Sequence, residues 1–174
     1  MILRDNFVHT DLHPGNIMVR PTVRGDDIQL VLLDYGLAEQ LTPEVRRHFV
    51  GFLNCICAGD GTAAARHLLS WSSGSQECQD PDALRAGLEA FFAQHCRADG
   101  DEGINLDRVL KGILGLCRTY GVSIDSQYAA LVTGTCVIVG LAAALDPHLN
   151  VADASAACLY AHALTGRLVG RLYS

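Results

Sequence analysis

The sequence has no run of lysines and arginines: 13 of its 174 residues are basic and 19 are acidic, which gives a net charge of −6. Domains that bind nucleic acid carry a basic patch or stripe against the phosphates, so no nucleic-acid partner is expected. The chain is also not of the disordered class, because 49% of its residues are hydrophobic and only 18% are charged. Its length suffices for one domain with a real core.

No C-x-x-C pair occurs among the seven cysteines, and most of them lie within apolar helical patterns. An odd number of cysteines at such spacings favours reduced, buried thiols in an intracellular compartment over a disulfide framework, and argues against structural zinc. The seven are Cys55, Cys57, Cys78, Cys96, Cys117, Cys136 and Cys158.

The first six residues lack the features of a signal peptide, because they contain an acid and no small-residue cleavage site. The sequence reaches a polar, functional-looking loop within a few residues of Met1. An enzyme rarely starts at its catalytic loop, so we expect a large N-terminal part to precede this sequence in the intact protein. Any targeting segment would then lie upstream.

A polar loop from His9 to Asn16 has apolar, β-prone residues on both sides, which indicates strand, loop and strand. A second β-prone run, residues 28–33, follows a polar turn and leads directly into Asp34. A hairpin built this way places Asp11, Asn16 and Asp34 side by side. Two carboxylates and a carboxamide supply the oxygen ligands that Mg²⁺ prefers.

Helical patterns fill the rest of the chain. Thr42 and Pro43 are typical of an N-cap and a first helical residue, and the turn at residues 58–61 ends that helix. The Ser/Gly-rich segment 72–80 is predicted to be a loop or linker. Further helices are expected over residues 62–71, from 81 to about 95, from Asn105 or Asp107 to about 120, over 125–145, and over 151–172.

Residues 128–145 contain no charged side chain. Their length lies at the lower edge of the roughly 17–25 residues that a membrane-spanning helix requires. A fully buried helix of an all-helical lobe explains the same composition. We favour the buried helix over the membrane span.

The spacing of Asp11 and Asn16, followed by Asp34-Tyr-Gly36, resembles the catalytic and metal-binding loops of the protein-kinase-like fold, H-R-D-x-x-x-x-N and D-F-G. Two groups of that superfamily come close to residues 9–16. The aminoglycoside/choline phosphotransferases use H-G-D-x-x-x-x-N, and the UbiB/ADCK atypical kinases use H-x-D-x-H-P-G-N.

The remaining motifs favour the UbiB/ADCK family. They are similar to its C-terminal lobe at residues 33–38, 42–44, 59–61 and 140–147. The sequence of residues 5–9 looks closest to the eukaryotic ADCK-two-like branch. The resemblance implies an α+β, mainly α fold: one partial kinase-like domain over 1–174. A hairpin in residues 1–40 would carry the catalytic and metal loops, and about six helices would follow in 41–174.

The resemblance also implies roles for the loop residues. Asp11 matches the catalytic aspartate, which accepts the substrate hydroxyl proton or orients the nucleophile. Asn16 and Asp34 match the two Mg²⁺ ligands, and Gly36 joins them in the ATP-binding set. His9 is expected to orient the catalytic loop by a hydrogen bond to the backbone, and His13 to shape the turn.

Several parts that the family implies are missing: an alanine-rich nucleotide loop, an ion-paired lysine and a K-x-G-Q helix. The only lysine, Lys111, lies far along the chain in a helical pattern. This sequence would therefore hold metal ligands without a phosphate cradle. The absent N-terminal kinase lobe is the expected partner, and the chain alone is expected to be inactive.

For the intact protein, the resemblance implies Mg²⁺-dependent ATP hydrolysis or phosphoryl transfer linked to coenzyme Q biosynthesis and lipid homeostasis. It further implies a mitochondrial location, with lipid or quinone-pathway partners or a membrane surface. Three alternatives stay open. The chain is an inactive binding or scaffold module, or it is a fragment of an aminoglycoside/choline-type phosphotransferase, or His9-x-Asp11-x-His13 forms a transition-metal or phosphohydrolase site.

Overall fold

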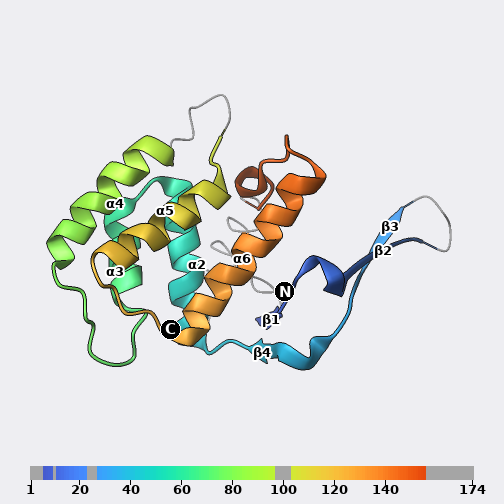
Figure 1. Ribbon diagram of the computed structural model, residues 1–174, viewed down its shortest axis with the longest axis horizontal. Helices are drawn as coiled ribbons and strands as arrows, with labels where there is room; N and C mark the ends of the chain where they lie inside the picture. The colour runs from blue at the N-terminus through green and yellow to red at the C-terminus, as the bar shows by residue number, and fades with distance from the viewer. Residues whose placement is uncertain (1–5, 10, 23–26, 97–102, 156–174) are drawn as a thin grey trace, which may run out of the picture.

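The computed structural model describes residues 6–9, 11–22, 27–96 and 103–155. A strand-rich N-terminal segment precedes a helical body (Figure 1). The strands form two antiparallel pairs, β1 with β4 and β2 with β3. Their bounds are β1 (Phe7–His9), β2 (Ile17–Pro21), β3 (Ile28–Leu32) and β4 (Ala38–Gln40).

The β2–β3 pair is the predicted hairpin, with Ile17 opposite Leu32 in its register. The β1–β4 pair was not predicted, because Ala38-Glu-Gln40 has little intrinsic preference for a strand. Its partner supplies the reason: Phe7 lies opposite Gln40, and the strand returns beside β1 after the turn that follows Asp34. The predicted catalytic and metal loops therefore lie between two short strand pairs rather than on one hairpin.

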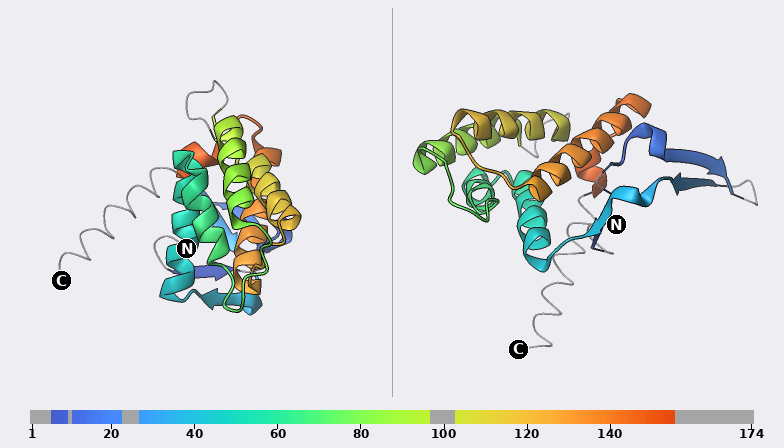
Figure 2. Two further views of the ribbon diagram at one scale, coloured as in Figure 1. Left: turned by 90° about the vertical axis from the view of Figure 1, so that its left-hand side faces the viewer. Right: turned by 60° about the horizontal axis from the view of Figure 1, so that its bottom comes forward.

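The β2–β3 hairpin projects away from the helical body in Figure 1 and in the right-hand view of Figure 2. Four large apolar side chains on it are exposed, by about half to two thirds: Met18, Val19, Ile28 and Leu30. An isolated two-stranded ribbon is at best marginally stable in water. This hairpin consequently offers an apolar surface that the described part of the chain does not cover.

The helical body agrees closely with the predicted boundaries. Thr42 caps its first helix by accepting a hydrogen bond from the Val45 amide over 3.2 Å, and Gly59 ends that helix in the left-handed conformation at φ 68°. The helices are α2 (Pro43–Ala58), α3 (Gly61–Leu69), α4 (Pro81–His95), α5 (Leu106–Thr119) and α6 (Ser126–Leu145). Residues 151–155 begin the last predicted helix, and the rest of that prediction lies outside the described residues.

An aromatic cluster forms the centre of the core. Trp71 is 1% exposed, lies parallel to the ring of Tyr128 with a centroid separation of 4.8 Å, and meets Phe52 edge-on at the same separation. These side chains come from α2, α6 and the segment after α3. Trp71 therefore joins elements that are far apart in the sequence, as expected for a core residue.

The Ser/Gly-rich segment is a loop, as predicted, but it is held in place. The Gln76 amide bridges it to the connection before α6: its Nε2 donates to the carbonyls of Leu69 and Ser123, and its Oε1 accepts from the Ser123 and Cys78 amides. One side chain thus satisfies backbone groups on two segments, which fixes the loop against the helical body.

The prediction of a fully buried helix over residues 128–145 is wrong. Only 22% of the apolar window in α6 is buried, while Val137, Ile138 and Leu145 are exposed. By length and composition α6 could cross a membrane. A helix that is apolar on every side shows no hydrophobic periodicity. The sequence therefore could not show whether other helices bury one side of α6 or all of its sides.

The thiols of Cys96 and Cys117 are expected to react slowly with iodoacetamide at pH 8. The described cysteines are free, and burial raises the pKa of both thiols to about 12, which leaves almost no thiolate to react. Mass spectrometry of native and urea-unfolded protein should find both sites modified only after unfolding. Rapid modification of either site in the native protein would contradict this packing.

Candidate functional site

The backbone of Leu33 connects the two predicted functional loops. Its amide donates to the Asn16 carbonyl over 2.8 Å, and its carbonyl lies 3.2 Å from Nε2 of the His9 ring. A protonated Nε2 donates across that distance. Since Asp34 is the next residue, the catalytic loop and the metal loop meet directly beside this carboxylate.

Asn16 and His9 are the two buried polar residues in the described part of the chain, and Asn16 is 8% exposed. Its Nδ2 donates to the carbonyl of Asp11 over 3.0 Å, which ties the two ends of the catalytic loop together. A carboxamide has donors on nitrogen and acceptors on oxygen. Because Nδ2 faces the Asp11 carbonyl, the side-chain oxygen, which is the atom a hard cation would take, is turned to the other side.

His13 and Gly15 form the tight turn inside this loop. The His13 ring accepts a hydrogen bond at Nδ1 from the Gly15 amide over 3.1 Å, at the start of the single 3₁₀ turn Pro14–Asn16. A Cβ at Gly15 would lie 2.9 Å from Cε1 of the His13 ring, so the ring packs against the backbone in the space that glycine leaves. His13 therefore shapes the turn, in agreement with the sequence interpretation.

Asp34 adopts a backbone conformation that is rare for a residue with a side chain, with φ 52° and ψ 78°. Aspartate tolerates the left-handed region better than most residues because its carboxylate bonds to nearby backbone. Here Oδ1 accepts from the Gly36 amide over 3.2 Å, and the residue remains exposed. The turn presents the Asp34 carboxylate to solvent at the end of β3.

His9 is 4% exposed, the more deeply buried of the two polar residues, and its ring lies 5.7 Å from that of Tyr35. Its bond to the Leu33 carbonyl is the kind of backbone contact that the sequence interpretation expected. Its Nδ1 has no hydrogen-bond partner among the described residues. The His9 ring therefore holds the loop through its Nε2 contact with the Leu33 carbonyl, and its Nδ1 makes no hydrogen bond to the described residues.

The structure brings His9, Asp11, Asn16 and Asp34 to one strand-loop junction through shared backbone contacts. Among the described residues, no group of three or more His, Cys, Asp or Glu side chains gathers to hold a metal. The oxygen set expected for Mg²⁺ is instead two carboxylates with one carboxamide, and both carboxylates are exposed. Carboxylate and carboxamide oxygens are the ligand types that a hard cation takes.

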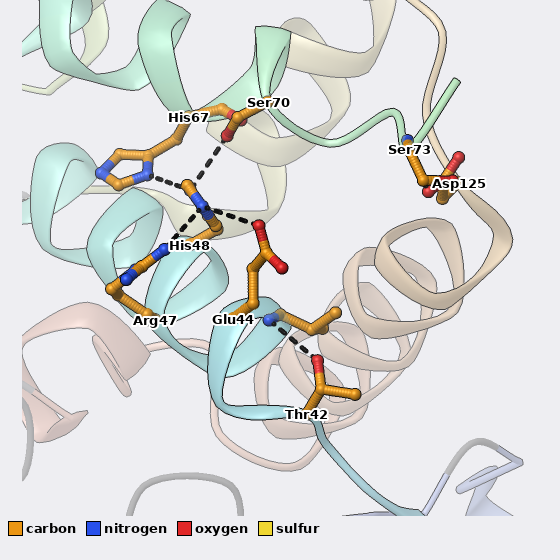
Figure 3. A network of polar contacts seen from close by, with 9 residues as sticks. Thr42, Glu44, Arg47, His48, His67, Ser70, Ser73 and Asp125 are labelled. Carbon is orange, nitrogen blue, oxygen red and sulfur yellow. Dashed lines mark hydrogen bonds and ion pairs between the residues drawn. The ribbon is translucent and has the colours of Figure 1, made fainter.

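One side-chain contact in the structure, between His48 and His67, is marked by no motif in the sequence. The two rings meet between α2 and α3, with centroids 5.6 Å apart (Figure 3). They are 19 residues apart in the sequence, so only the packing of the two helices reveals the contact.

Comparisons with known proteins agree with the motifs. Residues 1–68 match the ABC1 atypical kinase-like domain. The chain is 26% identical to a probable serine/threonine-protein kinase, abkC, of Dictyostelium discoideum, over 89% of this chain and 32% of that protein. It is 29% identical to the probable protein kinase UbiB of Pasteurella multocida, over 87% of this chain and 28% of that protein.

A third relative is the mitochondrial ABC1 family protein YPL109C of Saccharomyces cerevisiae, which is 20% identical over 89% of this chain and 30% of the relative. The chain spans about a third or less of the length of these curated relatives. No solved structure matches it.

Proposed function

We propose that this chain, whose residues 1–68 match the ABC1 atypical kinase-like domain, is a member of that family and carries the catalytic and metal-binding half of an ATP-using, kinase-like site. In this proposal Asp34 and the Asn16 side-chain oxygen hold Mg²⁺, and Gly36 places the Asp34 carboxylate. Asp11 accepts the proton of the attacking hydroxyl or water, and His9 positions the loop. The observation that supports it is the pair of hydrogen bonds at Leu33, which join both loops beside Asp34.

The proposed chemistry demands little covalent participation from the protein. Magnesium bound there would neutralise the charge that develops on the phosphates. Asp34 and Asn16 hold oxygen ligands in place, and Asp11 receives a proton at its carboxylate. Rigid placement of these groups is the contribution that the chain itself makes to phosphoryl transfer or ATP hydrolysis.

The phosphate cradle is proposed to come from the rest of a longer protein. Lys111 lies on α5, outside the loops described above, and its Nζ donates a hydrogen bond to Asp107 of the same helix over 2.7 Å. The exposed apolar face of the β2–β3 hairpin is suited to packing against such a lobe. Without it, the chain alone is expected to bind metal but to have no turnover.

The finer biological role is also a proposal. Kinship with proteins named UbiB and with a mitochondrial ABC1 family protein supports a role connected with coenzyme Q biosynthesis or lipid homeostasis in an organelle. The apolar surface of α6 suits association with a membrane. An inactive binding module is the competing function, favoured by the exposed hairpin and α6.

Mn²⁺, used as a paramagnetic substitute for Mg²⁺, tests the metal half of this proposal. We expect it to broaden the backbone amide NMR signals of Asn16 and of residues 33–36, and Asp34→Asn to reduce this broadening strongly because one anionic ligand is lost. Asp27→Asn is the matched control, since Asp27 is an exposed carboxylate at the far end of the same hairpin.

Equal broadening in wild type and Asp34→Asn would contradict the proposed ligand set. Loss of the Mn²⁺ broadening in the Asp27→Asn variant would contradict it as well. The dispersion of the remaining amide signals shows in the same spectra whether each variant is folded.

A further inference from the structure

The histidine pair, His48 on α2 and His67 on α3, has an unusual internal geometry. The two Nδ1 atoms face each other at 3.4 Å, and the rings are inclined by 75° (Figure 3). A hydrogen bond between two nitrogens is normally shorter, with a heavy-atom separation near 3 Å. The separation is therefore long for a direct bond between the rings.

A glycine on α2 makes this arrangement possible. Gly51 lies one turn after His48, and a Cβ at that position would come within 2.6 Å of Cε1 and 2.7 Å of Nε2 in the His67 ring. Real Cβ atoms do not approach ring atoms so closely. The His67 ring therefore rests on the α2 backbone in the space that Gly51 leaves, and this places its Nδ1 toward His48.

We propose that the histidine pair binds a divalent transition-metal ion through its two Nδ1 atoms, with water completing the coordination. Two ligands that each lie about 2.0–2.1 Å from a tetrahedral ion are separated by about 3.3–3.4 Å. The observed separation of 3.4 Å matches this value with no movement of either helix. Imidazole is a preferred ligand of nickel, copper and zinc, so the proposed ion belongs to that group.

The surroundings of His48 supply two further parts of such a site. The Ser70 hydroxyl oxygen lies 2.9 Å from Nδ1 of His48, where it can face a bound ion or its water. On the opposite side of the ring, a Glu44 carboxylate oxygen lies 4.0 Å from Nε2. Histidines that bind metal usually donate their other N–H to a carboxylate, and Glu44 is placed for that contact.

Two arginines oppose a bound cation. Arg47 has a guanidinium nitrogen 3.5 Å from Nε2 of His48, and Arg66 precedes His67 on α3. Both are exposed, so solvent and salt screen their charge. Burial, followed by the His48 ring and the two arginines, lowers the pKa of His67 below its usual value.

With two histidines and no third strong ligand among the described residues, the site is expected to exchange its ion, unlike a four-ligand structural zinc site. Titration of the untagged, reduced protein with Ni²⁺ tests it. We expect the imidazole NMR signals of His48 and His67 to be the first to broaden. His67→Asn should weaken binding at least about tenfold, by loss of one of two ligands.

The sharpest variant keeps both ligands and changes only their separation. Gly51→Ala adds one methyl group that pushes the His67 ring away, while alanine favours the helix more than glycine does. We expect Ni²⁺ affinity to fall to that of His67→Asn. His148→Asn, which removes an exposed imidazole elsewhere, should leave the affinity unchanged.

Two results would overturn the proposal. One is wild-type protein whose histidine signals broaden uniformly, which is non-specific binding. The other is a Gly51→Ala variant that binds Ni²⁺ as tightly as wild type, which shows that the pair is not the ligand set.

Discussion

Replacement of Trp71 by alanine is expected to lower the free energy of unfolding by about 3–5 kcal/mol, the usual cost of deleting a large buried aromatic side chain. Trp71 is 1% exposed and contacts Phe49, Phe52 and Tyr128, so its loss opens a cavity that three elements border. Small domains are stable by only about 5–15 kcal/mol, so the variant should be close to unfolding. Urea denaturation followed by circular dichroism measures the change.

Trp71→Phe is the matched control for this core position. It keeps an aromatic ring in the cluster and removes the indole N–H, which is buried without a hydrogen-bond partner in the described structure. We expect a clearly smaller loss than for alanine, because part of the contact area remains and an unpaired donor disappears. A loss below about 1 kcal/mol for Trp71→Ala would mean that Trp71 does not form the centre of the core.

Gly61→Ala is expected to have the second largest effect on stability. A Cβ at Gly61 would lie 2.7 Å from Cα and N of Glu89, which are backbone atoms of α4 and cannot rotate away. The methyl group must therefore push α3 and α4 apart, at a cost of about 1–3 kcal/mol. Thermal unfolding of the variant measures it.

Gly115→Ala is the control, with the opposite sign. Gly115 lies inside α5, and a Cβ there meets no atom within 4 Å. Alanine should stabilise that helix by about 0.5–1 kcal/mol through lower backbone entropy in the unfolded chain. Equal effects of the two substitutions would show that α3 and α4 are not in close backbone contact.

The helix starts could be predicted because their signals are local. Thr42 and Asp80 each precede a proline, and each side chain accepts a hydrogen bond from a backbone amide three residues later. The sequence left Asn105 and Asp107 as alternatives for α5. Asn105 is the cap, and it accepts from the Arg108 amide over 2.9 Å. Capping depends on the side chain and the next three residues, which the sequence displays directly.

Features that depend on tertiary contacts could not be predicted. The strand β4 forms only because β1 lies beside it, and the exposure of α6 depends on which neighbours cover an apolar helix. The histidine pair depends on the space that the missing Cβ of Gly51 leaves for the His67 ring. In the sequence, Gly51 looks like any other glycine in a helix. In each case the deciding partner is far away in the sequence.

The functional loops fall between these cases. Asp11, Asn16 and Asp34 were predicted as site residues from residue type and spacing, and the structure brings their backbones together. The residue that connects them, Leu33, was missed because it acts through its peptide group. Every residue has such a group, so no side-chain pattern could have marked it.

The central claim is that this chain holds a metal-dependent nucleotide half-site at Asn16 and Asp34. Thermal unfolding with ATP, in the presence and absence of Mg²⁺, tests it most directly, because a ligand that binds only the folded state raises the melting temperature. We predict that Mg²⁺ alone raises the melting temperature, that ATP raises it further only when Mg²⁺ is present, and that Asp34→Asn abolishes both increases. No increase in a folded protein, or an equal increase in Asp34→Asn, would contradict the claim.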